Sequence, residues 1–428
     1  MADLVASARL KRVQRTALVL LVVSGCINYV DRSTLAVGLP LIRQDLHLSI
    51  TQSGLLLSVF LWTYAVSQLP AGALIDRLGA RCMLSVGLGL WSMAQVLGGL
   101  VGSFWQFVVA RVLLGMGESP QFPSSARVVA DWFHRKERGF ATGVWNCSSS
   151  LGTAVAAPLL TFLMLRLGWR WMFIVMGVVG ILVAGIIRWL HRDPRQVDLT
   201  PAERQYLVED QPEAPRVTWR MWRSLFRFRT TWGMICGYMG SMYVLWIYNT
   251  WLPTYLEAEL HLSIAKTGWI ASVPFLFGVV GSLLTGRVCD HLLHRGFSPI
   301  ASRKIPMLFC LLGIALFTLI AASTLNVILA VSCISLSLFL VYGAACCAWA
   351  MAAVVAPVHL TASMGSIQNF FGYLGAASAP VLTGIIVAKT GSFQPALMAG
   401  ALFAVLGAVI YLALVRGPVG TNEAFDSR

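Results

Sequence analysis

Long apolar runs separated by short polar connections dominate the pattern of this chain. Residues 83–100, 104–126 and 327–355 are largely apolar and come near or above the roughly 20 residues that an α-helix needs to cross a bilayer. Such runs recur along the whole chain, which predicts an all-α membrane protein with twelve transmembrane helices. We place the helices near 17–40, 52–75, 83–101, 104–126, 139–165, 171–187, 230–256, 267–286, 305–323, 326–356, 362–388 and 394–415.

A polar, proline-bearing stretch interrupts this pattern at the middle of the chain. It contains HRDPRQVDLTPAERQYLVEDQPEAPRVTWR and separates six predicted spans from six. We therefore predict an N-terminal six-helix bundle at 1–187, a cytoplasmic linker at 188–229 and a C-terminal six-helix bundle at 230–428. Transporters built from repeats are often divided in this way.

The composition argues against a soluble protein. Hydrophobic residues make up 57% of the 428 residues and charged residues only 12%, with a mean hydropathy of +0.74, whereas soluble domains carry about 25% charged residues. Basic residues precede the first apolar run, but this run is too long and too interrupted by polar residues for a cleavable signal peptide. We interpret it as the first span.

The net charge of +14 indicates a membrane topology rather than nucleic-acid binding, because of how it is distributed. Of the 32 Lys and Arg residues, 25 fall in the termini and connections of one side and only 5 on the other, namely Arg43, Arg166, Arg170, Lys266 and Lys389. Positive residues accumulate on the cytoplasmic side of membrane proteins. Both termini and the linker are therefore predicted to be cytoplasmic, where basic groups also meet anionic lipid.

Other classes of chemistry find little support in the sequence. The nine cysteines, including the adjacent Cys346 and Cys347, show no metal-ligand spacing and no disulfide framework. No phosphate-binding G-x-x-x-x-G-K-[ST] motif occurs, which argues against ATP-driven transport by this chain. We expect neither an enzyme nor a bound cofactor or metal.

Four charged residues lie deep inside predicted spans: Asp31, Arg32, Arg111 and Glu118. Each costs about 2.5–3.5 kcal/mol near the centre of a spanning helix, so opposite charges are expected to pair. Arg111 and Glu118 are seven residues apart and share a helix face, whereas Asp31 and Arg32 point about 100° apart. We predict that Asp31 turns toward Arg111 and Arg32 toward a cavity. The alternative is an ion-pair network that only fixes helix packing.

The chemistry of these residues indicates movement of an anion. A guanidinium in a cavity can grip a carboxylate with two hydrogen bonds. A carboxyl group in a low-dielectric site takes up a proton more readily than in water. Carboxylates that exchange arginine partners when protonated would couple the movement of an anion to that of protons.

The end of the second span resembles a family signature. Gly72, Asp76, Arg77, Gly79 and Arg81 in GALIDRLGAR resemble the cytoplasmic loop motif of the major facilitator superfamily, and Asp290 lies in the corresponding GSLLTGRVCDHLLHRG of the second half. The resemblance implies two six-helix bundles around a central cavity that opens alternately to each side. Asp76, Arg77, Arg81 and Asp290 would then act in gating; the alternative is an ordinary basic loop beside a helix.

Three further stretches resemble one branch of that family, the anion:cation symporters, which include hexonate, hexuronate and glucarate permeases, sialin and vesicular glutamate carriers. The stretches are NYVDR (28–32), RVLLGMGESPQFP (111–123) and WLPTYL (251–256). The resemblance implies proton symport of a carboxylate. It assigns proton coupling to Asp31 and Glu118, the partner of the first-span aspartate to Arg111, and substrate contacts to Arg32, Tyr29, Tyr64, Trp349 and Asn369.

The chain departs from the sugar-acid permeases at two positions. Tyr238 stands where they carry a glutamine, and Tyr373 stands where they carry an asparagine. An amide offers both donor and acceptor to a polyhydroxylated acid, whereas tyrosine offers a ring face and one hydroxyl. We therefore predict that Tyr238 also contacts the substrate. The two tyrosines favour a less hydroxylated or an aromatic carboxylate as the substrate. Asn146 either lines the cavity or bonds helix to helix.

These features predict a symporter of the bacterial inner membrane that imports a small organic anion, a sugar acid or another carboxylate, together with protons. The family resemblance implies that it works as a monomer. Three alternatives remain open. An organic-phosphate exchanger would be expected to place a deep arginine in each half, and the second half has none. A uniporter would not depend on a proton gradient. A transporter-like receptor would be favoured by a long cytoplasmic signalling domain, which the linker and C-terminal tail do not provide.

Overall fold

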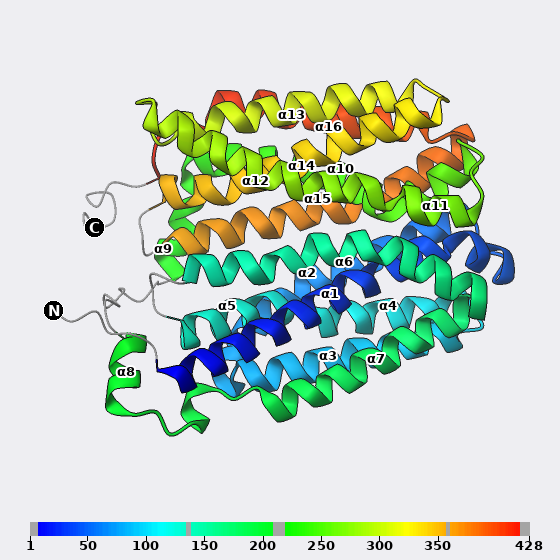
Figure 1. Cartoon of the computed structure of the whole chain (residues 1–428). Helices are drawn as coiled ribbons and strands as arrows, with labels where there is room; N and C mark the ends of the chain where they lie inside the picture. The colour runs from blue at the N-terminus through cyan, green and yellow to red at the C-terminus, as the bar shows by residue number, and fades with distance from the viewer. Residues whose placement is uncertain (1–6, 134–137, 209–218, 357–359, 420–428) are drawn as a thin grey trace. The chain divides into compact units, whose positions relative to one another are not determined.

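The computed structural model describes residues 7–133, 138–208, 219–356 and 360–419. In this part of the chain the regular elements are all helices, joined by short connections, without strands (Figure 1). The longer helices of the first half are α1 (Ala8–Asp45), α2 (Ile50–Leu78), α3 (Ala80–Leu100), α4 (Phe104–Glu118), α5 (Gln121–Trp132), α6 (Arg138–Leu167) and α7 (Trp169–Leu190). The linker holds η1 (Pro194–Gln196), α8 (Pro201–Val208), α9 (Trp219–Ser224) and η2 (Leu225–Arg227). The second half holds α10 (Arg229–Ala258), α11 (Ile264–Ile270), α12 (Ser272–His294), α13 (Ala301–Ala322), α14 (Val327–Val355), α15 (Thr361–Thr390) and α16 (Gln394–Leu414).

Ten helical segments of the described residues are long and apolar enough to cross a membrane, so the predicted number of twelve is not confirmed. The expected fourth span, 104–126, is divided at Ser119 and Pro120 into α4 and α5, and neither piece reaches spanning length. Proline has no backbone N–H, which interrupts the ladder of helical hydrogen bonds. The expected seventh span coincides with α10, which has the length of a span but is not among the ten apolar segments.

Polar side chains mark the ends of several helices. Ser7 caps α1 by accepting the Leu10 N–H at 3.0 Å, and Asn326 caps α14 by accepting the Leu329 N–H at 3.0 Å. Such caps satisfy N–H groups that have no partner inside the helix. The apolar runs therefore become helices whose ends are fixed by the polar residues between them.

Glycines allow close packing of helices around the buried charges. A Cβ atom at Gly117 of α4 would lie 2.5 Å from the backbone nitrogen of Trp91 on α3, and one at Gly87 would lie 2.8 Å from the Gly117 oxygen. Small residues at such contacts let helix backbones approach in membrane proteins. This approach holds α4, which ends in Glu118, against the part of α3 that carries Trp91.

The chain divides into two compact units. One comprises Met1–Leu48 and Trp62–Glu213, and the other comprises Ser49–Leu61 and Ala214–Arg428. Residues 49–61, the start of α2 included, thus belong with the C-terminal helices: Ser58 Oγ accepts the Val381 N–H at 3.1 Å. The bundle boundaries expected from the sequence stay predictions.

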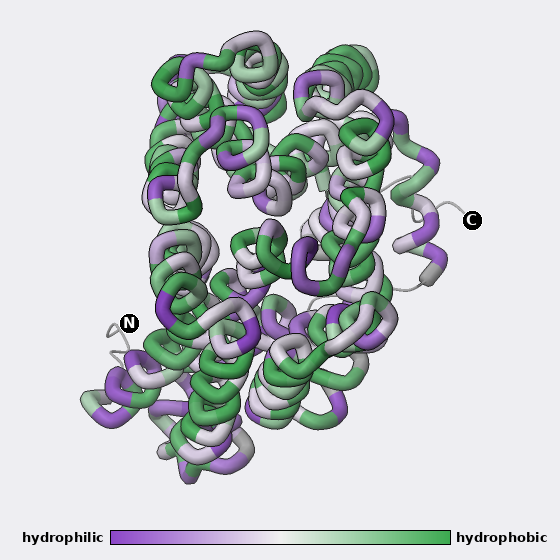
Figure 2. Tube along the Cα trace, turned by 90° about the vertical axis from the view of Figure 1, so that its right-hand side faces the viewer, coloured by the Kyte–Doolittle hydropathy of each residue, from purple (hydrophilic) through white to green (hydrophobic). Residues whose placement is uncertain are grey.

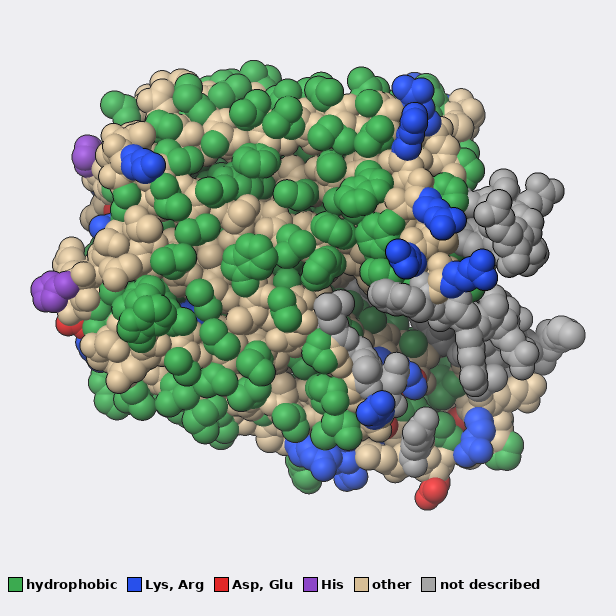
Figure 3. Space-filling view, turned by 180° about the vertical axis from the view of Figure 1, so that it is seen from behind, with side chains coloured by type: hydrophobic (Ala, Val, Ile, Leu, Met, Phe, Trp, Pro, Cys, Tyr) green, Lys and Arg blue, Asp and Glu red, His purple; other side chains and the backbone are tan. Residues whose placement is uncertain are grey.

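The surface is that of a protein surrounded by lipid. Large hydrophobic side chains are exposed along many helices, among them Trp105, Leu182, Phe309 and Ile328. Figure 3 shows hydrophobic side chains over most of the visible face, with Lys and Arg mainly near its margins. Figure 2 shows the same contrast along the chain, since hydrophobic residues predominate in the helices and hydrophilic ones in many of the connections. Removal from a bilayer would leave these surfaces in contact with water.

A buried charge cluster as the candidate substrate and proton site

Asp31 and Arg32 lie in the middle of α1 and are buried, at 0% and 7% exposure. Arg32 Nε donates to Glu118 Oε2 at 2.7 Å, and both side chains are almost fully enclosed. Glu118 is the last residue of α4, directly before the break at Ser119 and Pro120. Removing one member of a buried pair leaves an uncompensated charge and costs about 3–5 kcal/mol, so α1 and α4 are held together here.

Two tyrosines flank the guanidinium of Arg32. Its Cζ lies 4.6 Å from the ring centroid of Tyr64 on α2 and 4.9 Å from that of Tyr29, one turn earlier on α1. Ring faces attract cations through the negative part of their quadrupole. Arg32 is thus oriented by three neighbours, and the predicted residues Arg32, Glu118, Tyr29 and Tyr64 come together in one unit.

The remaining two charges complete the cluster. Asp31 Oδ2 accepts a hydrogen bond of 3.1 Å from Trp91 Nε1 on α3, and Asp31 also experiences the charge of Glu118. Arg111 is buried and interacts electrostatically with both Glu118 and Arg32. The pairing of Asp31 with Arg111 stays a prediction. Trp91 was not singled out from the sequence, because within an apolar span it resembles any core tryptophan.

The other expected substrate residues occupy different surroundings. Asn146 is exposed on α6 of the first unit. In the second unit Tyr238 is buried, and its ring would lie 2.5 Å from a Cβ at Gly372, whereas Trp349 is half exposed and packs beside Gly365. Asn369 on α15 is partly exposed. Their roles in binding stay predictions.

Tyr373, which stands where sugar-acid permeases are expected to carry an asparagine, belongs to a group of three aromatic side chains. The Tyr373 ring lies 6.1 Å from that of Trp246, and Trp246 lies 6.5 Å from Phe60, all within the second unit. Such rings offer apolar faces to a ligand and few hydrogen-bonding groups.

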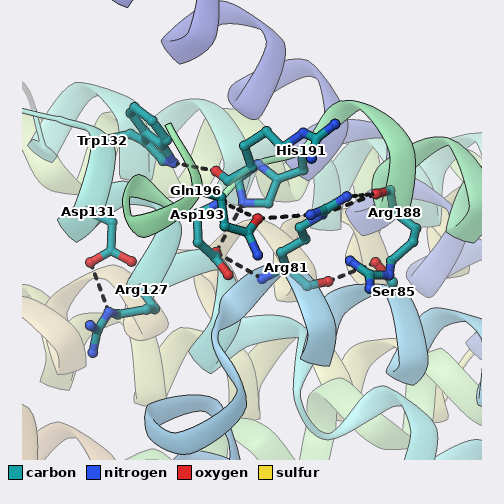
Figure 4. A network of polar contacts seen from close by, with 10 residues as sticks. Arg81, Ser85, Arg127, Asp131, Trp132, Arg188, His191, Asp193 and Gln196 are labelled. Atoms are coloured by element: carbon teal, nitrogen blue, oxygen red, sulfur yellow. Dashed lines mark hydrogen bonds and ion pairs between the residues drawn. The ribbon is translucent and has the colours of Figure 1, made fainter. Parts of the chain in front are cut away.

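The expected gating loop is held by the linker of its own unit (Figure 4). Arg81 donates from Nε to the Arg188 carbonyl at 3.1 Å and from Nη1 to Gln196 Oε1 at 2.8 Å. The Arg81 N–H is accepted by Asp193 Oδ1 at 3.1 Å, so Asp193 caps the start of α3. Arg77 and Asp290 are exposed, and the side chain of Asp76 lies outside the described part. Asp193 and Gln196 were not predicted from the sequence. Both contact Arg81, more than a hundred residues away along the chain, and such a contact leaves no local sequence pattern.

Within the residues that the structure describes, no group of three or more His, Cys, Asp or Glu side chains could hold a metal ion. The arrangement of the charge cluster instead suits binding of an anion and exchange of protons between carboxylates.

Comparisons with known proteins place the chain in a family. The model for the Major Facilitator Superfamily matches residues 21–380 and 259–428. The chain belongs to this superfamily. The fold agrees: a bacterial homolog to the human lysosomal transporter Spinster, in an inward-facing and unoccupied conformation, superposes with a TM-score of 0.79 at 19% identity, over 94% of this chain and 97% of the other.

Several curated relatives are named as transporters of sugar acids. The chain is 44% identical over 417 residues to the probable L-galactonate transporter of Escherichia coli K12, covering 96% of this chain and 92% of the relative. It is 32% identical to the D-galactonate transporter of Escherichia coli O6:H1, covering 93% and 94%, and 31% identical to a probable galactarate/D-glucarate transporter of Bacillus subtilis, covering 92% and 90%. The resemblance to the sugar-acid permeases is confirmed, and so are a multi-pass membrane protein and a role in transport.

Proposed function

We propose that this chain imports a hexonate, with L-galactonate as the first substrate to test, together with protons across the bacterial inner membrane. The observation that carries the proposal is the buried Arg32–Glu118 pair with Asp31 and Arg111 beside it. The 44% identity to a probable L-galactonate transporter supports the hexonate.

The geometry offers a mechanism for coupling. A substrate carboxylate that binds the Arg32 guanidinium competes with Glu118 for that positive charge, because Glu118 Oε2 already accepts from Arg32 Nε at 2.7 Å. A carboxylate that loses its arginine partner inside an apolar unit is unstable as an anion and takes up a proton. Protonation of Glu118 therefore accompanies substrate binding, and release of the substrate returns Glu118 to Arg32. Asp31, held by Trp91, supplies the second acid.

A second substrate class has a specific observation in its favour. The rings of Phe60, Trp246 and Tyr373 stand together where an amide was expected. Apolar faces suit the ring of an aromatic carboxylate, so such acids belong in the same experiment. The chain acts as a monomer with both termini in the cytoplasm, and Arg77, Arg81 and Asp290 contribute to gating in this proposal.

The test is uptake of radiolabelled acids by the purified protein in liposomes. L-galactonate is expected to accumulate when the outside is acidic and to stop accumulating when a protonophore collapses the gradient. Hexuronates, aldarates and benzoate-type acids are compared as competitors. Accumulation that persists without the proton gradient would indicate a uniporter or exchanger, and competition only by neutral solutes would reject the anion site.

A further inference from the structure

Polar side chains continue beyond Glu118 between α1 and α5 of the first unit. Gln121 opens α5, and its Nε2 donates to Ser24 Oγ on α1 at 2.8 Å. Both side chains are buried. Ser124 lies one turn after Gln121 on α5, and Asn28 lies one turn after Ser24 on α1, so each follows the same helix face. The hydrogen bond between Gln121 and Ser24 brings these two faces together.

Several polar atoms on these faces have no hydrogen-bond partner. Gln121 Oε1, Ser124 Oγ and Glu118 Oε1 are enclosed and unpaired. Asn28 interacts with Glu118, yet neither of its amide atoms makes a well-formed hydrogen bond. Buried polar atoms are nearly always bonded to protein or to ordered water, and a recess with several such atoms is where internal water binds.

Apolar side chains lie beyond these polar side chains, toward the start of α1. Ser124 lies in the first turn of α5, one turn after Gln121 and beyond the break that follows Glu118. Toward the start of α1 the buried residues become apolar: Ala17, Leu20 and Leu21 on α1 and Val128 and Val129 on α5. Beyond them Gln14 Nε2 donates to the Trp132 carbonyl at 2.8 Å. The buried polar side chains therefore lie between Glu118 on one side and a layer of apolar side chains on the other.

We propose that Gln121, Ser24, Ser124 and Asn28 form a water-binding recess that relays the proton between Glu118 and the end of the unit where α1 begins. This rests on the proposed proton coupling. The proton leaves the Glu118 carboxyl group for a hydrogen-bonded water and is passed along the recess, and no electrons are transferred. Glu118 becomes a carboxylate again and pairs with Arg32. The apolar layer prevents a leak until α1 and α5 separate there.

The experiment compares two activities of the full-length protein in liposomes. Net uptake of L-galactonate driven by an acidic exterior requires the proton to be released inside. Exchange of external labelled for internal unlabelled L-galactonate at equal pH does not. Gln121→Leu keeps the size of the side chain and removes its polar atoms. In Gln121→Leu we expect net uptake to fall about tenfold and exchange to stay within about twofold of the native rate. We also expect D₂O to slow net uptake by a larger factor in this variant than in the native protein.

The chain offers a matched control in Gln95 on α3. Gln95 is also buried, and its Nε2 donates to the Thr34 hydroxyl on α1 at 2.7 Å, but Thr34 lies on the other side of Asp31 from Ser24. Gln95→Leu therefore removes a similar helix-to-helix bond outside the recess and should leave the ratio of net uptake to exchange unchanged. Ser124→Ala, a smaller change, should lower that ratio in the same direction as Gln121→Leu.

Two results would overturn the relay. One is that Gln121→Leu and Ser124→Ala both keep the native ratio of net uptake to exchange. The other is an equal fall of the ratio in Gln95→Leu, which would reduce Gln121 to a packing residue. Failure of the native protein to accumulate substrate under a proton gradient would instead reject the coupling itself, and it is recognised without any variant.

Discussion

At the scale of the residue, Arg32 combines three interactions that a lysine cannot reproduce together. Its guanidinium pairs with Glu118 and lies over the rings of Tyr64 and Tyr29. A planar guanidinium can stack and still offer hydrogen bonds at its edge, whereas an ammonium is a compact, strongly hydrated charge. Arg32 is therefore held in one orientation by these three neighbours.

Arg32→Lys should weaken binding of L-galactonate at least about tenfold, which corresponds to about 1.4 kcal/mol. The charge is kept, but an ammonium can neither hold a carboxylate with two parallel hydrogen bonds nor stack on the two rings as a guanidinium does. Titration calorimetry on the purified protein measures the effect. Arg166→Lys is the control, since Arg166 also lies over a ring, that of Phe162 at 5.8 Å, but is exposed. Equal affinities for both variants would contradict a role of Arg32 in binding.

At the scale of the element, the start of the linker is bound to the helices of its own unit. Asp193 caps α3, Arg81 reaches the last turn of α7, and the Trp132 indole donates to the Arg192 carbonyl at 3.1 Å (Figure 4). Gly79 makes this possible: its φ of 84° and ψ of 157° are reached essentially by glycine alone, and a Cβ there would lie 2.5 Å from Asp193 Oδ2.

Gly79→Ala should destabilise the protein more than Gly168→Ala. Both glycines precede a helix with a φ of 84°, but nothing lies within 4 Å of a Cβ at Gly168. Backbone strain of about 1–3 kcal/mol is common to both, and only Gly79→Ala also displaces Asp193, whose cap contributes about 1 kcal/mol. Thermal unfolding in detergent measures the difference. Adding Asp193→Ala to each variant should reduce it, and an unchanged difference would contradict the capping role.

A buried histidine at the start of the linker, His191, should make the stability of the protein depend on pH. Burial lowers the pKa of His191, partly opposed by Asp193, whose Oδ1 lies 3.9 Å from its Nε2. A histidine whose folded-state pKa is depressed binds fewer protons when folded than when unfolded. Its contribution to stability is present above the unfolded pKa of about 6.5 and is lost as pH falls through the folded pKa.

Unfolding temperatures measured from pH 7.5 to pH 5 test this contribution. The native protein should lose stability over that interval, and His191→Gln should lose less. His294→Gln replaces an exposed histidine and should follow the native curve. A His191→Gln curve parallel to the native one would show that the buried imidazole does not titrate in this way.

At the scale of the whole molecule, the apolar runs were sufficient to predict helices, and the deep charges were sufficient to predict that ionisable side chains would be paired inside the helices of the first unit. The family resemblance singled out Arg32, Glu118, Tyr29 and Tyr64, and these residues lie together in the first unit. The pairing of Arg32 with Glu118 was not predicted, because the sequence does not show which way each side chain of α1 turns. Trp91 and Asp193 could not be predicted, because each contacts a residue sixty or more positions away and only the packing of helices brings the pair together. The break after Glu118 could have been expected from Pro120. It was not predicted, because the span 104–126 was placed by its hydropathy, which does not show where a proline interrupts a helix.

The central claim is that the Arg32–Glu118 pair couples protons to the substrate, and Glu118→Gln tests it most directly. The amide cannot release a proton, so the variant should exchange L-galactonate across liposomes but fail to accumulate it when the outside is acidic. Exchange also shows that the variant is folded, although it has lost a buried ion pair. Accumulation by Glu118→Gln at the native level, still abolished by a protonophore, would contradict the account, since protons would then be coupled elsewhere.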